Sequence, residues 1–289
     1  METPFPPFEP EEANRAGGTR LRDIPLKAIF PNLITLLAIC SGLTAIRFAV
    51  ESRLELAVGA IVLAAFLDGI DGRVARFLKS TTRFGAQMDS LADFVNFGVA
   101  PALLLYFTLL DQVHSFGWIA ALIFAICACL RLARFNVMLE MPDRPKWQRN
   151  FFIGVPAPAG ALVSLAPVYA MLLGSTEPGD AFAVFSVFYV VVIALLMVSS
   201  LPTFSGKELG RRVPRNLVLP LLIIVVAGVA ALLSYPWQML LVCVLVYLGF
   251  LPLGYRSWRA HRAAETALAG DGQQPSGGKT DGASPEQAS

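Results

Sequence analysis

Eight apolar runs, each of roughly 18 to 22 residues, divide most of this 289-residue chain into segments long enough to cross a membrane. The core of a soluble protein does not require runs of this length. The composition agrees, because 55% of the residues are hydrophobic and only 15% are charged, against about 25% charged in an ordinary globular domain. The sequence therefore predicts an all-α fold, a polytopic membrane helical bundle of about eight transmembrane helices.

The approximate limits of the predicted spans are residues 31–50, 54–72, 89–110, 117–139, 155–174, 181–201, 216–234 and 236–255. The fifth span contains Pro156, Pro158 and Pro167, so we expect a kink there. The chain starts with the acidic, proline-rich stretch "METPFPPFEPEE", and no signal peptide is expected.

The segments outside the spans are polar. Residues 1–19 and 263–289 are rich in Gly, Pro, Ser, Glu and Gln, which predicts a disordered tail at each end. Residues 20–30, "RLRDIPLKAIF", mix basic and apolar positions and predict an interfacial juxtamembrane helix. The net charge of +2 is too small to indicate a nucleic-acid-binding protein. The four cysteines all lie in apolar segments, and we expect them to be free thiols.

Lysine and arginine residues lie mostly on one side of the predicted membrane. The connections after the first, third, fifth and seventh spans contain one basic residue, Arg53. The basic residues of the other side are Arg73, Arg76, Lys79, Arg83, Arg131, Arg134, Arg144, Lys146, Arg149, Lys207, Arg211, Arg212, Arg215, Arg256, Arg259 and Arg262. Because basic loops remain in the cytosol, both termini are expected to be cytosolic, in a multi-pass protein of the cell (inner) membrane.

Four aspartates, Asp68, Asp71, Asp89 and Asp93, fall within 26 residues at the cytosolic ends of the second and third spans. The spacings of three and four residues put each pair on one face of a helix. Four carboxylates brought together repel one another unless cations lie between them, and an all-oxygen site suits Mg²⁺ or Mn²⁺. The alternative is a solvated helix end whose acids pair with neighbouring arginines.

Small residues favour the metal-site interpretation. Gly69, Gly72, Ala75 and Gly85 remove side-chain bulk where an anionic ligand could approach the backbone, and Arg76 can neutralise a phosphate. The combination indicates a site for a phosphate-bearing nucleotide.

The stretch from Asp68 to Asp93 reads D-x-x-D-G-x-x-A-R, then eight residues, then G-x-x-x-D-x-x-x-D. It resembles the signature of the CDP-alcohol phosphotransferases at all eight fixed positions, with no departure. Five further segments resemble the phosphatidylserine synthase branch of that family. They are "PNLITLLAICSGLTAI" (31–46), "QMDSLADFVNFGVAPALLLY" (87–106), "LRLARFNV" (130–137), "FFIGVPAPAGA" (151–161) and "LPTFSGK" (201–207).

The resemblance implies a CDP-alcohol phosphotransferase membrane domain at residues 31–207, with a six-helix catalytic core, followed by two additional transmembrane helices within residues 208–262. The implied reaction joins CDP-diacylglycerol and L-serine to give phosphatidylserine and CMP. It further implies two Mg²⁺ or Mn²⁺ ions, contact with membrane lipids and a homodimer.

The resemblance also implies residue roles. Asp68, Asp71 and Asp89 would bind both metal ions, and Asp93 would be the general base for the serine hydroxyl and a further metal ligand. The residues expected at CDP-diacylglycerol are Gly72, Ala75, Arg76 and Gly85.

The serine pocket is less defined by the sequence. Arg131 or Arg134, with Asn136 nearby, is expected to contact the serine carboxylate or the lipid phosphate, and Lys207 is a weaker candidate. Anchoring of these cations to anionic headgroups is the alternative. His114 and His261 lie outside every matched segment and receive no role.

Two other functions remain open. A transferase of the same family could use glycerol 3-phosphate, inositol or inositol phosphate as its acceptor. A divalent-cation transporter or binding protein could also use four aspartates, but transporters place such sites near the bilayer midplane, whereas these acids lie at its cytosolic edge.

Overall fold

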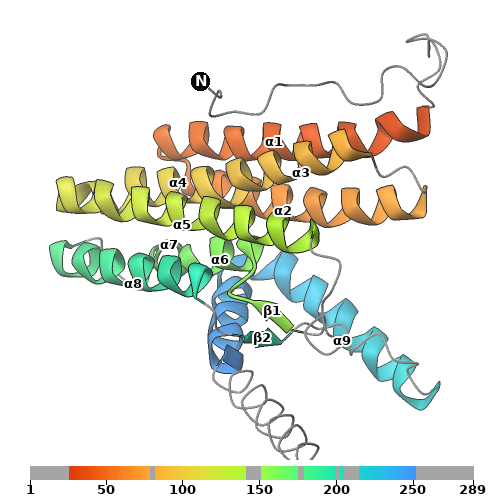
Figure 1. The fold of residues 1–289 in the computed structure, drawn as a ribbon. Helices are drawn as coiled ribbons and strands as arrows, with labels where there is room; N and C mark the ends of the chain where they lie inside the picture. Colours follow the sequence, from red (N-terminus) through yellow and green to blue (C-terminus); the bar gives the residue numbers. More distant parts are fainter. Residues whose placement is uncertain are drawn as a thin grey trace, which may run out of the picture. The chain divides into compact units, whose positions relative to one another are not determined.

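The structure is a computed structural model that describes residues 26–78, 82–140, 151–174, 179–199, 202–204 and 215–251. The described chain is almost entirely helical (Figure 1), which confirms the predicted fold class. It divides into two compact units, residues 1–141 with 156–198 and residues 142–155 with 199–289, and each is described by itself. The domain limits inferred from the sequence stay predictions.

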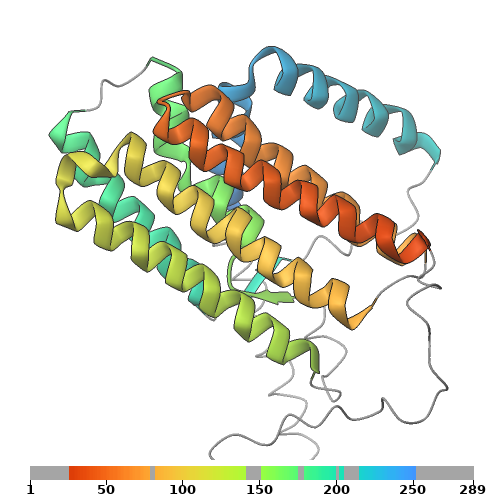
Figure 2. The same ribbon diagram turned by 90° about the horizontal axis from the view of Figure 1, so that it is seen from above.

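The first unit contains α1 (Leu26–Val50), α2 (Leu54–Phe77), α3 (Arg83–Phe94), the π-helical turn η2 (Val95–Val99), α4 (Ala100–Thr108), the 3₁₀ turn η3 (Leu110–Val113), α5 (Ser115–Glu140), α6 (Ala157–Ser164), α7 (Ala166–Leu172) and α8 (Asp180–Val198). Helices α1 and α2 pack along each other, and so do α5 and α8 (Figures 1 and 2). The continuous run of α3, η2 and α4 lies beside α1 and α5.

Four of the described helices are long and apolar enough to cross a membrane: Phe30–Val50, Phe84–Thr108, Ser115–Met138 and Asp180–Val198. Three apolar helices are shorter: Ala157–Leu172, Val218–Ser234 and Pro236–Leu251. Helix α2 has 24 residues, but its last turns are charged. The chain is thus a polytopic helical membrane protein.

Prolines have different effects in two of the helices. Helix α1 runs without interruption through Pro31, so residues 26–30 of the predicted interfacial segment belong to the same helix as the first span. The fifth predicted span is broken at Leu165, and Pro167 lies in the first turn of the helix that follows. A proline cannot donate the backbone hydrogen bond of a helix interior but fits a first turn, so the break confirms the expected kink.

Small residues allow close packing of α1 against α2. Ala38, Ala45, Ala57 and Ala64 are at most 1% exposed, and such side chains let two helices approach closely within a bilayer. Large apolar side chains such as Leu37 point outward instead. Small side chains thus lie between the helices and large apolar side chains lie on the outside, which is the arrangement that a bundle surrounded by lipid requires.

The second unit contains a short antiparallel ladder that the sequence did not predict. Strand β1 (Phe151–Ile153) pairs with β2 (Pro202–Phe204), and Phe152 lies opposite Thr203. Strands of three residues are too short to show the period-two alternation by which strands are recognised. The ladder is followed by α9 (Arg215–Ser234) and by a further helix, Pro236–Leu251.

We predict that Gly117→Ala destabilises the fold. Gly117 begins α5 against η3, and a Cβ there would overlap the backbone carbonyl group of Leu110. Overpacking against a fixed backbone costs about 1–3 kcal/mol. Thermal unfolding of the detergent-purified protein should show a lower midpoint.

The matched control is Gly59→Ala in α2, where a Cβ meets nothing within 4 Å. Replacing an unconstrained mid-helix glycine by alanine gains about 0.5–1 kcal/mol, so this variant should unfold no earlier than the wild type. An equal decrease of the unfolding midpoint in both variants would contradict the explanation by packing.

Candidate metal and nucleotide site

Three of the four motif aspartates converge in the structure. Asp68 and Asp71 lie near the end of α2, and Asp89 lies in the middle of α3. Each offers a carboxylate oxygen, and these oxygens all lie within 4.8 Å of one another. The predicted convergence of the two helical pairs is therefore seen for these three side chains, which we call the carboxylate cluster.

The start of α3 is fixed by local hydrogen bonding and by a close contact with α1. Thr82 is the N-cap, and its hydroxyl oxygen accepts a hydrogen bond from the Gly85 amide at 3.0 Å. A Cβ at Gly85 would lie 3.0 Å from the Asn32 amide oxygen and 3.1 Å from the Thr82 hydroxyl. The motif glycine thus relieves crowding where α3 meets α1, in addition to any ligand that it admits.

Helix α1 contributes a direct hydrogen bond to the carboxylate cluster. The Thr35 hydroxyl donates to Asp71 Oδ2 at 2.8 Å, and both residues are 4% exposed. Asp71 is the buried member of the cluster, whereas Asp68 and Asp89 are partly exposed. A carboxylate removed from water needs such donors or a cation.

Asp93 lies one helical turn beyond Asp89, with its carboxyl group beside that of Asp68. Its Oδ1 atom is buried and has no hydrogen-bond partner among the described residues. The carboxylates of Asp68 and Asp89 and the Arg131 guanidinium, on α5, all lie within electrostatic range of this carboxyl group. Asp93 is therefore adjacent to the cluster, with one oxygen available to a ligand.

Helix α5 places the candidate serine-binding residues in different surroundings. The Asn136 side-chain amide donates to the Ser90 hydroxyl at 3.0 Å, which ties it to the aspartate-bearing helix α3. Arg134 donates to the Val198 carbonyl oxygen at 3.3 Å, at the end of α8. Arg131 lies within electrostatic range of the motif aspartate Asp93.

The remaining predicted residues lie on the same two helices or outside the described chain. Gly72 and Arg76 are exposed in the last turns of α2, and Ala75 is partly exposed. A Cβ at Gly72 would meet nothing within 4 Å, so the backbone there is open to a ligand. Lys207 lies outside the described residues.

The donor set fits a divalent cation. Three carboxylates this close repel one another, and Asp71 has little solvent to screen its charge. Hard oxygen ligands from carboxylates are the ones that Mg²⁺ and Mn²⁺ prefer. The residues present therefore match the divalent cation that the motif implies.

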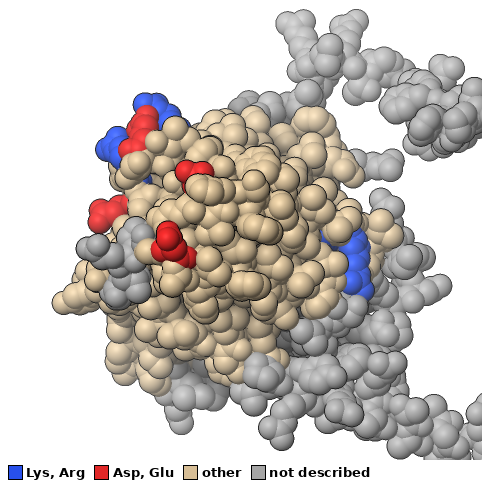
Figure 3. All heavy atoms as spheres, turned by 90° about the vertical axis from the view of Figure 1, so that its left-hand side faces the viewer, with Lys and Arg blue, Asp and Glu red and all other residues tan. Residues whose placement is uncertain are grey.

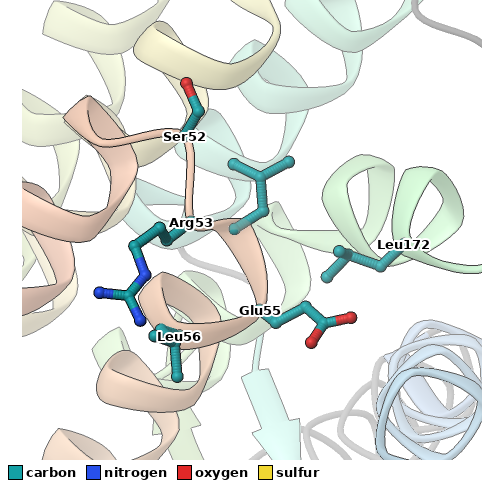
Figure 4. A pocket seen from close by; sticks show the side chains of 6 residues that line it. Ser52, Arg53, Glu55, Leu56 and Leu172 are labelled. Atoms are coloured by element: carbon teal, nitrogen blue, oxygen red, sulfur yellow. The ribbon is translucent and has the colours of Figure 1, made fainter.

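A hollow at the other end of α2 is not part of this site. Its lining includes Ser52, Arg53, Glu55 and Leu172, whose side chains Figure 4 shows around the opening. Asp68 is 14 residues beyond Leu54, which is about 20 Å along a helix. The hollow is too far away to hold a ligand of the carboxylate cluster.

Sequence reasoning missed Asn32, Thr35 and Ser90. The first two lie in the matched segment at residues 31–46, but nothing in that segment assigned them a role. A threonine in an apolar helix commonly bonds its own backbone four residues back, and Thr35 does lie 3.2 Å from the Pro31 carbonyl oxygen. The contact with Asp71 spans 36 positions, so local spacing could not reveal it.

Known proteins resemble this chain over most of its length. A CDP-diacylglycerol–serine O-phosphatidyltransferase of Mycobacterium tuberculosis is 41% identical over 231 residues, 80% of this chain and 79% of its own length. The protein of that name from Helicobacter pylori is 35% identical over 204 residues, 68% of this chain and 79% of its own. The one from Bacillus subtilis is 39% identical over 145 residues, 50% of this chain and 78% of its own.

The family models agree with these relatives. Residues 216–252 match the model described as CDP-alcohol phosphatidyltransferase 2. Residues 28–199 match the CDP-alcohol phosphatidyltransferase model, a range that contains the complete aspartate motif and every helix of the carboxylate cluster. The chain belongs to the CDP-alcohol phosphatidyltransferase family.

Proposed function

We propose that this protein is a CDP-diacylglycerol–serine O-phosphatidyltransferase, an integral membrane enzyme that makes phosphatidylserine and CMP for phospholipid biosynthesis. The observation that carries this function is the carboxylate cluster of Asp68, Asp71 and Asp89, with Asp93 beside it. The names of relatives that are 35% to 41% identical over at least two thirds of the chain support serine as the acceptor.

The carboxylate cluster would hold two Mg²⁺ or Mn²⁺ ions, with Asp93 as an additional ligand. Bound metal of this kind stabilises the negative charge of a phosphoryl group and of its leaving oxygen. The chain's own contribution is to present the carboxylates from two helices at one place.

Asp93 is suited to accept the proton of the serine hydroxyl. Its Oδ1 has no hydrogen-bond partner among the described residues, so this oxygen is open to a serine hydroxyl. In the reaction, a bond forms between the serine hydroxyl oxygen and the phosphorus next to diacylglycerol. The bond from that phosphorus to the oxygen of CMP breaks, and the serine proton passes to Asp93.

The nucleotide would lie along the last turns of α2. Gly72 leaves open space at its Cβ position, and Ala75 adds little bulk on the same helix. The exposed Arg76 would pair with a phosphate of the cytidine diphosphate group. Gly85 would complete this surface from the first turn of α3, where a Cβ would crowd the side chains of Asn32 and Thr82.

Arg131 is the better candidate for the serine carboxylate. It acts on Asp93, whereas Arg134 is bonded to the end of α8. An arginine next to the general base would hold serine with its hydroxyl near the proton acceptor. Asn136 would support this arrangement through Ser90, and Lys207 stays a weaker candidate.

The protein would lie in the cell (inner) membrane as a homodimer, with both termini and the carboxylate cluster cytosolic. Figure 3 faces the opposite end of the molecule, where α1 turns into α2, and blue and red side chains lie against one another at its edge. There Glu51 pairs with Arg47 at 2.7 Å and with Arg53 at 3.9 Å, which offsets their positive charge. The charge pattern thus supports a cytosolic cluster.

CMP release tests the function directly. Purified protein with CDP-diacylglycerol should release CMP when L-serine and Mg²⁺ or Mn²⁺ are both present, and should form phosphatidylserine in equal amount. Excess EDTA should abolish release because it removes the cations, and Asp89→Ala should abolish it because the cluster loses one of its three carboxylate ligands. Faster CMP release with glycerol 3-phosphate, inositol or inositol phosphate than with serine would refute the proposal that serine is the acceptor. Full activity in EDTA would refute the requirement for a divalent cation.

Asp93→Asn should reduce turnover on the order of 10²-fold or more, because asparagine keeps the shape of the side chain but cannot accept the serine proton. The affinity for CDP-diacylglycerol should fall much less, since the three residues of the carboxylate cluster remain. Turnover and lipid-nucleotide affinity are measured on the same preparation. If both fall together, Asp93 acts mainly as a metal ligand; if neither falls, it has no catalytic role.

The orientation can be tested by cysteine labelling in intact cells, in a variant without the four native cysteines. Gln112→Cys lies on the exposed η3 turn and should react with a membrane-impermeant reagent. Phe77→Cys, at the end of α2 where the side chain is 87% exposed, should react only after the cells are permeabilised. The reverse pattern would place the carboxylate cluster outside the cytosol.

A further inference from the structure

Thr35 connects a helix without motif residues to the carboxylate cluster. It lies in α1, and its hydroxyl is 2.8 Å from Asp71 Oδ2 in α2. Both side chains are 4% exposed, so water does not compete for this contact. The bond is therefore a fixed part of the site.

The direction of this hydrogen bond follows from the chemistry of its partners. An ionised carboxylate can only accept, and a hydroxyl has a single proton to donate. The Thr35 hydroxyl has two acceptors within reach, the Pro31 carbonyl oxygen at 3.2 Å and Asp71 Oδ2 at 2.8 Å. The shorter, charge-assisted bond to Asp71 is the stronger one.

The bond restricts how Asp71 can bind a cation. Because Oδ2 accepts from Thr35, rotation of the carboxylate is restricted, and the Gly72 backbone also bonds to this carboxyl group. Asp68 and Asp89 lie within reach of the same point. Ligating carboxylates that are hydrogen-bonded in this way bind metal more tightly than free ones.

We propose that Thr35 is a positioning residue for Asp71, and that its hydroxyl sets the affinity of the carboxylate cluster for a divalent cation. This rests on the proposed function only in treating Asp71 as a metal ligand. The first predicted span is accordingly part of the metal site, although it contains none of the eight motif positions.

The competing explanation is that Thr35 only holds α1 against α2. The same helix pair offers a matched control, because the Ser41 hydroxyl in α1 donates to the Ala60 carbonyl oxygen in α2 at 2.7 Å. Ser41 lies six residues further along α1, about 9 Å from Thr35. Removing it deletes an interhelical hydrogen bond of similar length without touching an aspartate.

The test measures Mn²⁺ binding to the purified full-length protein without substrate, by electron paramagnetic resonance of the free ion. Thr35→Val keeps the side-chain shape but removes the hydroxyl, and should weaken Mn²⁺ binding about 10- to 100-fold. Thr35→Ser restores the hydroxyl and should bind Mn²⁺ as the wild type does. Ser41→Ala should also bind Mn²⁺ as the wild type does, even where its unfolding temperature falls.

If Thr35→Val folds too poorly for the binding measurement, a second measurement uses Thr35→Ala in its place. In Thr35→Ala and the wild type, the rise in unfolding temperature on adding Mn²⁺ reports binding to the folded state, and the rise should be smaller in the variant. In CMP release, raising Mn²⁺ should restore much of the activity that Thr35→Val loses.

Three results would overturn the proposal: wild-type Mn²⁺ affinity in Thr35→Val, equal weakening in Thr35→Val and Ser41→Ala, or failure of Thr35→Ser to restore binding. None of these depends on which alcohol the enzyme accepts. Absence of serine-dependent CMP release from the wild type would refute the proposed function while leaving the Mn²⁺ comparison valid.

Discussion

Repulsion among carboxylates at the edge of a membrane is the constraint on which the rest of this structure depends. Asp68, Asp71 and Asp89 come within 4.8 Å of one another, and the field between such charges is strong where little water screens it. The fold could avoid the repulsion by turning one side chain away. It instead directs all three to one point, which stabilises the chain only if a cation or a bound phosphate–metal complex lies there.

The surrounding helices hold this unfavourable arrangement in place. Helix α1 bonds Asp71 through Thr35 and approaches the start of α3 closely, so that a Cβ at position 85 would make a tight contact with Asn32. Helix α5 reaches α3 through the bond between Asn136 and Ser90. The motif glycine thus has a packing role in addition to any role in admitting nucleotide. A site assembled on packed helices keeps its geometry better than one on loops, which suits a reaction that requires in-line displacement.

The sequence predicted what is encoded locally. Hydrophobic run length predicted the membrane helices, prolines predicted the break at Leu165, and the spacing of Asp68, Asp71 and Asp89 predicted their convergence. Sequence patterns did not predict contacts between positions that are distant in the chain. Two arginines three residues apart on α5 were indistinguishable in sequence, yet Arg131 acts on Asp93 and Arg134 bonds the end of α8. The β1–β2 ladder joins segments about 50 residues apart and is too short to have a periodic pattern.

The π-helical turn η2 explains how one span serves two different environments. Successive residues of an α-helix rotate by about 100°, so Asp89 and Ser90 of α3 meet different neighbours, the carboxylate cluster and α5. Directly after Asp93 and Phe94, the wider turn at Val95–Val99 inserts an extra residue into the helical repeat. The faces of α4 are thereby shifted relative to those of α3. The polar face required by the aspartates ends at η2, and the buried apolar residues Leu104 and Leu105 can be oriented for packing independently of it. In a regular α-helix the face of the buried leucines would keep a fixed α-helical relation to the face of the aspartates, and this turn releases one from the other.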